Sequence, residues 1–180
     1  SKHEFGKAYQ VLDLTCDEHE IIEFISKAEN TYGGDSSEFY ELVIKKITEE
    51  TSWREGSVKS VLLIADATPH EVGYSYGNRV RNNKIDWRAE AKKAAEKGIK
   101  FDTLSIGDSQ WFTELSEMTN GVHSPFSTGS KTPQLVEAAA LSRGGENAKA
   151  LYKANYQKFV EEGDMEMIDV YSEYSKEALC

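Results

Sequence analysis

Two short polar stretches of the sequence carry side chains that could hold a metal ion. Residues 33–38 read GGDSSE, and residues 66–70 read DATPH directly after the apolar run at residues 61–65. Carboxylate and hydroxyl oxygens that converge from two loops suit a hard cation such as Mg²⁺, and the candidate ligands are Asp66, Asp35 and Ser36. The residues also allow a plainer interpretation, in which Asp35 and the serines cap a helix and Asp66 only ends a strand.

The two loops can meet if the segments around them form a parallel sheet. Residues 58–66 (VKSVLLIAD) and 99–107 (IKFDTLSIG) are continuous apolar runs of the kind found at the centre of such a sheet, and a helical segment separates them. We therefore predict that residues 58–65 and 99–106 are adjacent parallel strands. In such sheets ligands bind beyond the carboxyl ends of the strands, and Asp66 lies at that end of a strand expected to be central.

The rest of the chain alternates strands and helices, which predicts an α/β fold with a mostly parallel sheet flanked by helices. Residues 8–15 (AYQVLDLT) alternate apolar and polar side chains and are predicted to form a strand, and residues 122–128 (VHSPFST) are predicted to form a short edge strand. From residue 146 onward the pattern is helical, with a break expected near Gly163. The helix after the first loop has side chains at helical spacing at Phe39, Leu42, Val43, Lys46 and Ile47.

Charge and composition limit the classes of partner. The 180 residues suit one domain and carry a formal net charge of −10, which argues against binding nucleic acid or an anionic membrane through bulk charge. An acidic balance is compatible with a divalent cation or a basic partner. No apolar stretch approaches the roughly 18 residues that a membrane span needs. Cys16 and Cys180 resemble neither a disulfide framework nor a zinc site, which favours a reducing, cytoplasmic setting.

Four motifs follow one another along the first 130 residues. They read GGDSSE, LLIADATPH, IKFDTLSIGDS and FTELSEMTNGVHSPFST, and their order and spacing resemble a von Willebrand factor A (vWA) domain over residues 8–140. The likeness is to a branch, known from intracellular multidomain proteins, whose loops read Gly-Gly-Asp-x-Pro-Glu and Asp-Ala-Pro-Pro-His. Ser37 and Thr68 replace one proline in each loop. The resemblance implies a Rossmann-like sheet with helices on both sides and commonly a metal-ion-dependent adhesion site (MIDAS).

The resemblance also implies roles for individual residues. Asp66 matches the family's metal-site aspartate, and Asp35 falls where many members have the metal-site threonine, with Ser36 beside it as a substitute. Glu38 and His70 match residues typical of the branch. Our candidates for contacts to a partner are therefore Glu38, Thr68 and His70, and the resemblance implies neither a catalytic residue nor an organic cofactor.

One part of the family pattern is missing. The first strand of a vWA domain ends in Asp-x-Ser-x-Ser, which supplies most of the metal ligands, and this sequence begins at what resembles the third strand. Three explanations stay open: the sequence is a fragment, a partner supplies the first strand, or the metal site is lost. Because Mg²⁺ needs well-placed oxygen ligands, we expect its binding to this chain alone to be weak or absent.

The leading interpretation is a protein-interaction module. It has a vWA-like domain at residues 1–145, truncated at its N-terminus relative to the family, and a C-terminal helical extension at residues 146–180. The expected partner is a protein that completes the sheet or the metal site, and oligomer formation stays open. The alternatives are a structural subunit of a larger assembly, such as a virion or scaffold component, and a metal-dependent hydrolase using Asp66, Asp35 and His70. We expect no enzymatic activity, because no nucleophile–base pair is apparent.

Overall fold

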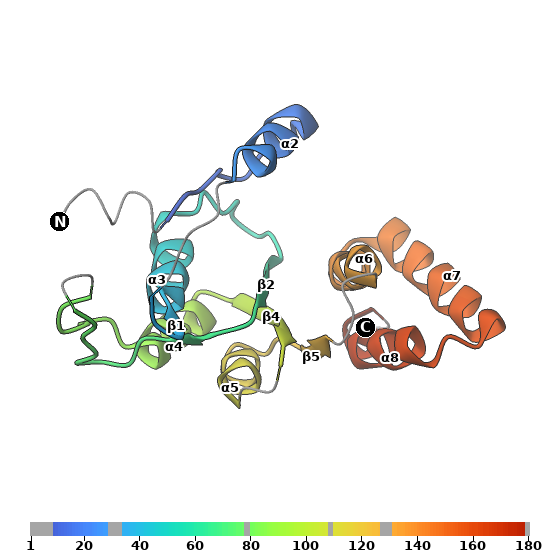
Figure 1. Ribbon diagram of the computed structural model, residues 1–180. Helices are drawn as coiled ribbons and strands as arrows, with labels where there is room; N and C mark the ends of the chain where they lie inside the picture. Colours follow the sequence, from blue (N-terminus) through green and yellow to red (C-terminus); the bar gives the residue numbers. More distant parts are fainter. Residues whose placement is uncertain (1–8, 29–33, 78–79, 108–109, 127–130, 179–180) are drawn as a thin grey trace. The chain divides into compact units, whose positions relative to one another are not determined.

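The computed structural model describes residues 9–28, 34–77, 80–107, 110–126 and 131–178 (Figure 1). The chain divides into two compact units. Unit 1 comprises Ser1–Ser57 and Ala67–Lys97, and unit 2 comprises Val58–Asp66 and Gly98–Cys180. The two loops singled out above therefore belong largely to unit 1, whereas Asp66 belongs to unit 2.

The described part of unit 1 consists of helices and one short pair of parallel strands. Its elements are α2 (Glu18–Ser26), β1 (Ser37–Glu38), α3 (Tyr40–Glu50), β3 (Thr68–Pro69) and α4 (Trp87–Glu96). The carboxylates of Asp17 and Asp86 accept hydrogen bonds from N–H groups in the first turns of α2 and α4, as N-cap residues do. Helices α3 and α4 pack together, and their fully buried apolar side chains are Ile44, Trp87, Ala91 and Ala94.

The described sheet of unit 2 is entirely parallel. It contains β2 (Lys59–Ala65), β4 (Ile99–Ile106) and β5 (His123–Phe126), in the order β2-β4-β5. Leu62 of β2 lies opposite Asp102 of β4. The prediction that residues 58–65 and 99–106 are adjacent parallel strands is thus confirmed, as is the short edge strand near residue 123.

Different helices cover the two faces of this sheet. Thr103 of β4 donates a hydrogen bond to the Phe112 carbonyl in α5 (Gln110–Met118), whereas the next residue, Leu104, shares a hydrophobic cluster with α6 (Thr132–Ser142). Successive side chains of a strand point to opposite faces, so α5 and α6 lie on opposite sides of the sheet. The predicted α/β fold, a parallel sheet flanked by helices in a Rossmann-like arrangement, is confirmed.

Two more helices extend the layer that α6 begins. Helices α7 (Glu146–Glu162) and α8 (Met165–Ala178) pack against α6 and against each other, and Figure 1 shows the three grouped together. Gly163, with a left-handed φ of 70°, ends α7 and makes the predicted break. The core that these helices share with β4 is rich in aromatic side chains, including Tyr152, Tyr171 and Tyr174. Among the described residues, every helix is too short or too polar to span a lipid bilayer.

The strand predicted at residues 8–15 is absent from residues 9–15, and that prediction is wrong. Residues 9–13 have no regular secondary structure, and the Asp13 carboxylate instead accepts hydrogen bonds from the N–H groups of Leu14 and Ser52, at 2.9 and 3.1 Å. A strand requires a hydrogen-bonded neighbour, and no strand in the described part of the chain pairs with this segment. The alternation of apolar and polar side chains in the sequence does not indicate whether such a neighbouring strand exists.

The position of β2 also differs from the prediction. The sequence predicts a central strand, but in the described sheet β4 is central and β2 lies at an edge. Between Ile99 and Ser105, every side chain of β4 except Lys100 is buried, whereas most of β2 is half buried and Ile64 is 45% exposed. A continuous apolar run indicates a strand suited to burial on both faces, but it does not identify the neighbours of that strand.

Candidate functional site

The pairing of β1 with β3 brings the two predicted loops together in unit 1. Ser37 lies opposite Thr68, and Glu38 lies opposite Pro69. The hydroxyl oxygens of Ser37 and Thr68 are 3.3 Å apart, at hydrogen-bond distance. Of the candidate residues, Thr68 and Ser36 are exposed and Glu38 is half buried.

Asp66 takes no part in the contacts described for unit 1. It is exposed and directly follows Ala65 at the carboxyl end of β2, in unit 2. Its predicted closeness to Asp35 therefore stays a prediction.

Two tyrosines of the loop after β3 hold the first polar stretch in place. The Tyr74 hydroxyl donates a hydrogen bond of 2.7 Å to Asp35 Oδ2, and the Tyr76 hydroxyl donates to the carbonyl of Gly34. The hydrogen bond to the Asp35 carboxylate raises the pKa of Tyr74 to about 12. One oxygen of Asp35 is therefore already engaged by the protein itself.

His70 is the buried centre of this region. Its side chain is 1% exposed and its ring lies 4.7 Å from the Phe39 ring and 4.9 Å from the Tyr74 ring, measured between centroids. The His70 N–H donates to Glu41 Oε2 at 3.0 Å, while Nδ1 lies 3.1 Å from Glu41 Oε1. On the other side of the ring, Nε2 is 3.4 Å from Asp35 Oδ2. A ring that is 1% exposed offers almost no surface to a partner.

Glu41 is a buried carboxyl that the sequence motifs do not single out. It begins the buried face of α3, which continues with Ile44 and Thr48. Burial raises the pKa of Glu41 above the ordinary carboxyl value, and the hydrogen bonds from His70 offset this only in part. Glu41 and His70 together fix the loop that begins at Thr68 onto helix α3.

Asn83 makes several of the hydrogen bonds that close the loop after His70. Asn83 Nδ2 donates to the carbonyls of His70 and Ile85, both at 3.0 Å, and the Asn83 N–H donates to the Tyr74 carbonyl at 2.9 Å. These bonds tie Asn83 to the backbone on both sides of Tyr74, the residue that bonds to Asp35. In the sequence the same segment appears only as a polar, glycine-containing loop.

The titration of Glu41 leads to a prediction about stability. Because the folded protein holds the Glu41 proton more tightly than the unfolded chain does, the free energy of unfolding should fall as pH rises between the ordinary carboxyl pKa and the raised one. In Glu41→Gln this fall should be absent. Urea unfolding of both proteins across this interval, with the exposed Glu49→Gln as control, tests it. If the difference in free energy of unfolding between the wild type and Glu41→Gln stays constant with pH, the raised pKa of Glu41 is contradicted.

The candidate metal ligands do not fit a site held by this chain alone. In the part of the chain that the structure describes, no group of three or more His, Cys, Asp or Glu residues is arranged to hold a metal ion. Asp35 is engaged by Tyr74, which leaves Asp66 and two exposed hydroxyls, those of Ser36 and Thr68. Mg²⁺ requires near-octahedral oxygen geometry and sheds its water reluctantly, so these groups would need further ligands from elsewhere.

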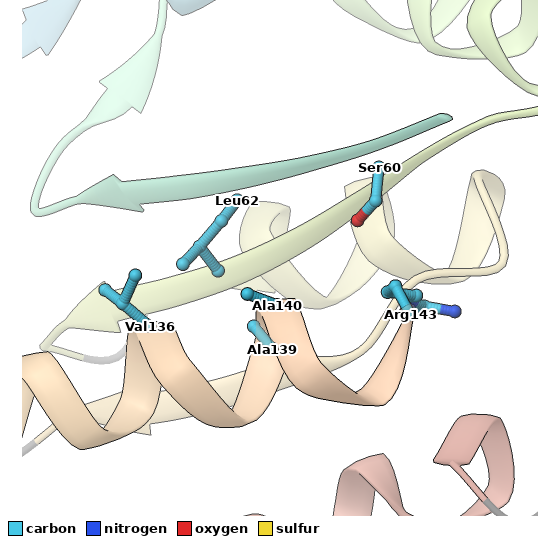
Figure 2. A pocket seen from close by; sticks show the side chains of 6 residues that line it. All are labelled: Ser60, Leu62, Val136, Ala139, Ala140 and Arg143. Atoms are coloured by element: carbon cyan, nitrogen blue, oxygen red, sulfur yellow. The ribbon is translucent and has the colours of Figure 1, made fainter. Parts of the chain in front are cut away.

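Unit 2 contains a hollow of about 220 Å³ between β2 and α6 (Figure 2). This is below the roughly 300–1,000 Å³ of typical small-molecule sites. Figure 2 labels the side chains that line it: Ser60 and Leu62 from β2, Val136, Ala139 and Ala140 from α6, and Arg143, which directly follows α6. A mostly apolar hollow of this size, beside an edge strand, suits an apolar side chain better than a whole ligand.

Comparison of the sequence with known protein families and with curated proteins gives no match. The vWA resemblance therefore rests on the motifs themselves.

Proposed function

We propose that the chain is a protein-interaction module of the vWA type, and that its partner adds a strand to the sheet at β2. The single observation that carries this proposal is the edge position of β2, a strand whose apolar sequence suits burial on both faces. Natural edge strands are commonly short or protected by charged residues and proline. In β2 only Lys59, at its start, is charged.

The hydrogen bonds of β4 identify which groups of β2 face outward. The N–H groups of Phe101 and Thr103 bond to Thr119 Oγ1 and to the Val122 carbonyl, on the β5 side of β4. The N–H of the intervening Asp102 therefore points towards β2. In a parallel pair with Leu62 opposite Asp102, this places the N–H groups of Val61 and Leu63 against β4 and those of Ser60, Leu62 and Ile64 on the outer edge.

An added strand would use both the outer N–H groups and the hollow. Addition of an extended segment to a sheet edge obtains affinity from main-chain hydrogen bonds and specificity from pockets for alternate side chains. The hollow beside Leu62 lies on the face of β2 that carries Ser60, Leu62 and Ile64. Alternate apolar side chains of the added strand would extend over it (Figure 2).

Strand addition also supports the metal-site interpretation. In the vWA family the strand that bears Asp-x-Ser-x-Ser supplies most of the metal ligands, and Asp66 follows the carboxyl end of β2. A partner strand of that kind would therefore provide the oxygens that this chain lacks. Asp66 and the partner strand would together hold Mg²⁺, whose charge would attract an acidic residue of the partner, as the vWA resemblance implies.

Other assignments have less support. A hydrolase using Asp66, Asp35 and His70 needs an accessible histidine, but His70 is 1% exposed and both its N–H and Nδ1 face Glu41. A structural subunit of an assembly would use the same edge with a permanent neighbour. We place the module in the reducing cytoplasm because Cys16 is an exposed free thiol.

For the isolated chain we predict no useful Mg²⁺ site. A ligand of the native state raises stability by mass action, so thermal unfolding in EDTA and in millimolar Mg²⁺ reports binding. We expect the same midpoint in both, for the wild type and for Asp66→Ala. A clear stabilisation by Mg²⁺ that disappears in Asp66→Ala would show that the chain alone holds the cation.

The strand proposal is tested with a labelled peptide that has a five-residue valine and isoleucine run followed by Asp-x-Ser-x-Ser. Binding is measured by fluorescence anisotropy. The control peptide has proline at alternate positions of the run, because proline cannot donate to the ladder. We expect only the first peptide to bind.

Matched variants locate the binding. Ile64→Lys places a charge on the outer strand, and Ile106→Lys makes the same change on the same face of β4, at 53% rather than 45% exposure. We expect Ile64→Lys to weaken binding about tenfold or more, which corresponds to about 1.4 kcal/mol, and Ile106→Lys to leave it unchanged. The proposal would be contradicted if Ile64→Lys and Ile106→Lys weakened peptide binding equally, or if the proline peptide bound as tightly as the first peptide.

A further inference from the structure

We propose that helix α2 is a second docking surface, which binds a basic, amphipathic helical segment of a partner protein. This inference goes beyond the β2 edge and lies on unit 1. The surface is defined here by the apolar side chains of Ile21, Ile22 and Ile25 and by the carboxylates around them.

Helix α2 exposes a face that helices normally bury. None of its residues is buried, and Ile21, Ile22 and Ile25 are 39%, 63% and 65% exposed. Ile21 and Ile25 are four residues apart, so they lie one above the other on one side of the helix. An isoleucine stripe of this kind is the usual core-facing side of an amphipathic helix.

Local interactions give α2 only modest support. Asp17 caps its first turn by accepting hydrogen bonds from the N–H groups of His19 and Glu20, and Glu23 pairs with Lys27. A single cap and a single exposed ion pair stabilise a helix only slightly. A helix of nine residues is marginal in water without packing. Contact of its isoleucine face with a partner would supply the packing.

The charges around this face select the kind of partner. Residues 9–28 carry five carboxylates, Asp13, Asp17, Glu18, Glu20 and Glu23, and only one lysine or arginine, Lys27. Two copies of α2 placed face to face would bring these carboxylates together, and anionic lipid or nucleic acid would be repelled. A protein helix with an apolar stripe and lysine or arginine beside it matches both the isoleucines and the charges.

The probe is a designed helical peptide with leucine at positions i, i+3, i+4 and i+7 and lysine elsewhere. One control peptide has glutamate in place of lysine. A second has the same composition as the probe with the leucines scattered, so that it keeps the charge without the stripe. Binding to the full chain is measured by fluorescence anisotropy in low and high salt. We expect the striped basic peptide to bind at least tenfold more tightly than either control, and less tightly in high salt.

The matched variants are Ile22→Gln with Ile25→Gln, and Leu151→Gln with Val160→Gln on α7. Leu151 and Val160 are 47% and 43% exposed, so the second pair removes exposed apolar surface from another helix, although less of it than the first pair does. Glutamine is a good helix former, and circular dichroism checks that α2 persists. We expect the first pair to weaken peptide binding at least tenfold and the second pair to leave it unchanged.

Three results would overturn the proposal. They are equal binding of the scattered peptide, no effect of the Ile22 and Ile25 changes, and self-association of the wild type in sedimentation that these changes abolish, since the occupant would then be a second copy. Ile64→Lys, which blocks the β2 edge, should bind the basic peptide as the wild type does. Failure of the α2 proposal is thereby distinguished from failure of the strand proposal.

Discussion

Asp102→Ala is expected to lower the free energy of unfolding of unit 2 by about 3–5 kcal/mol, the usual cost of removing one partner from a buried ion pair. Asp102 is fully buried, and the Arg143 side chain is 6% exposed. Arg143 Nη2 and the Val122 N–H donate to Asp102 Oδ1 at 2.6 and 2.8 Å, and Arg143 Nε and Ser60 Oγ donate to Oδ2, both at 3.3 Å. Alanine removes all four hydrogen bonds. It also leaves the buried guanidinium of Arg143 without the carboxylate that balances its charge.

Urea unfolding measures this effect, with Asp169→Ala as the matched control. Asp169 is exposed on α8, so its loss should change the free energy of unfolding by less than about 0.5 kcal/mol. Adding Arg143→Met to Asp102→Ala should recover part of the loss, because the buried positive charge is removed as well. If Asp102→Ala were as stable as Asp169→Ala, Asp102 would not be holding β4, β5 and α6 together.

Gly121→Ala is expected to destabilise unit 2 by about 3 kcal/mol, at the upper end of the usual range for overpacking. A Cβ at residue 121 would lie 1.9 Å from the carbonyl oxygen of Phe101 and 2.5 Å from its carbonyl carbon. Both atoms belong to the main chain of β4, so the clash cannot be relieved by rotating a side chain. The strand or the turn before β5 would have to move.

Gly145→Ala is the control for this change. A Cβ at Gly145 meets no atom within 4 Å. Gly145 is the N-cap of α7, where alanine is less favourable than glycine, so the cost should be about 1 kcal/mol. Chemical denaturation of the two variants, or the loss of soluble folded Gly121→Ala alone, checks the expectation. Equal stability of both variants would mean that Gly121 is not pressed against β4.

The parallel pairing of β2 with β4 in unit 2 could be predicted because its signals are local. Residues 58–65 and 99–106 are apolar runs of strand length with a helical segment between them, and such units place their strands side by side and parallel. Gly163 could be predicted to break the C-terminal helices because glycine accepts the left-handed φ that ends α7. Each of these signals depends on residues near one another in the chain.

The edge position of β2 and the missing strand at residues 9–15 could not be predicted in the same way. Both depend on which segments are available as neighbours. An apolar run such as β2 and an alternating segment such as residues 9–15 look the same in the sequence whether or not a neighbouring strand is present.

The motifs predict that the two polar stretches lie together, but they do not predict the contacts inside this region. The two polar stretches are brought together by the pairing of Ser37 with Thr68, but the motifs did not reveal the partners of His70. The regularly spaced residues Phe39, Leu42, Val43, Lys46 and Ile47 are half buried, whereas the fully buried positions of α3 are Glu41, Ile44 and Thr48. A carboxylate three residues before a buried isoleucine was the available signal for Glu41.

Amide hydrogen exchange along β2 tests the central claim, that this strand has a free edge for a partner, most directly. In the free chain the account predicts an alternating pattern: slow exchange for the N–H groups of Val61 and Leu63, which face β4, and fast exchange for those of Leu62 and Ile64. On adding the Asp-x-Ser-x-Ser peptide, Leu62 and Ile64 should become protected while Val61 and Leu63 change little. Uniform slow exchange along β2 in the free chain, or no change at Leu62 and Ile64 when the peptide is present, would contradict the account.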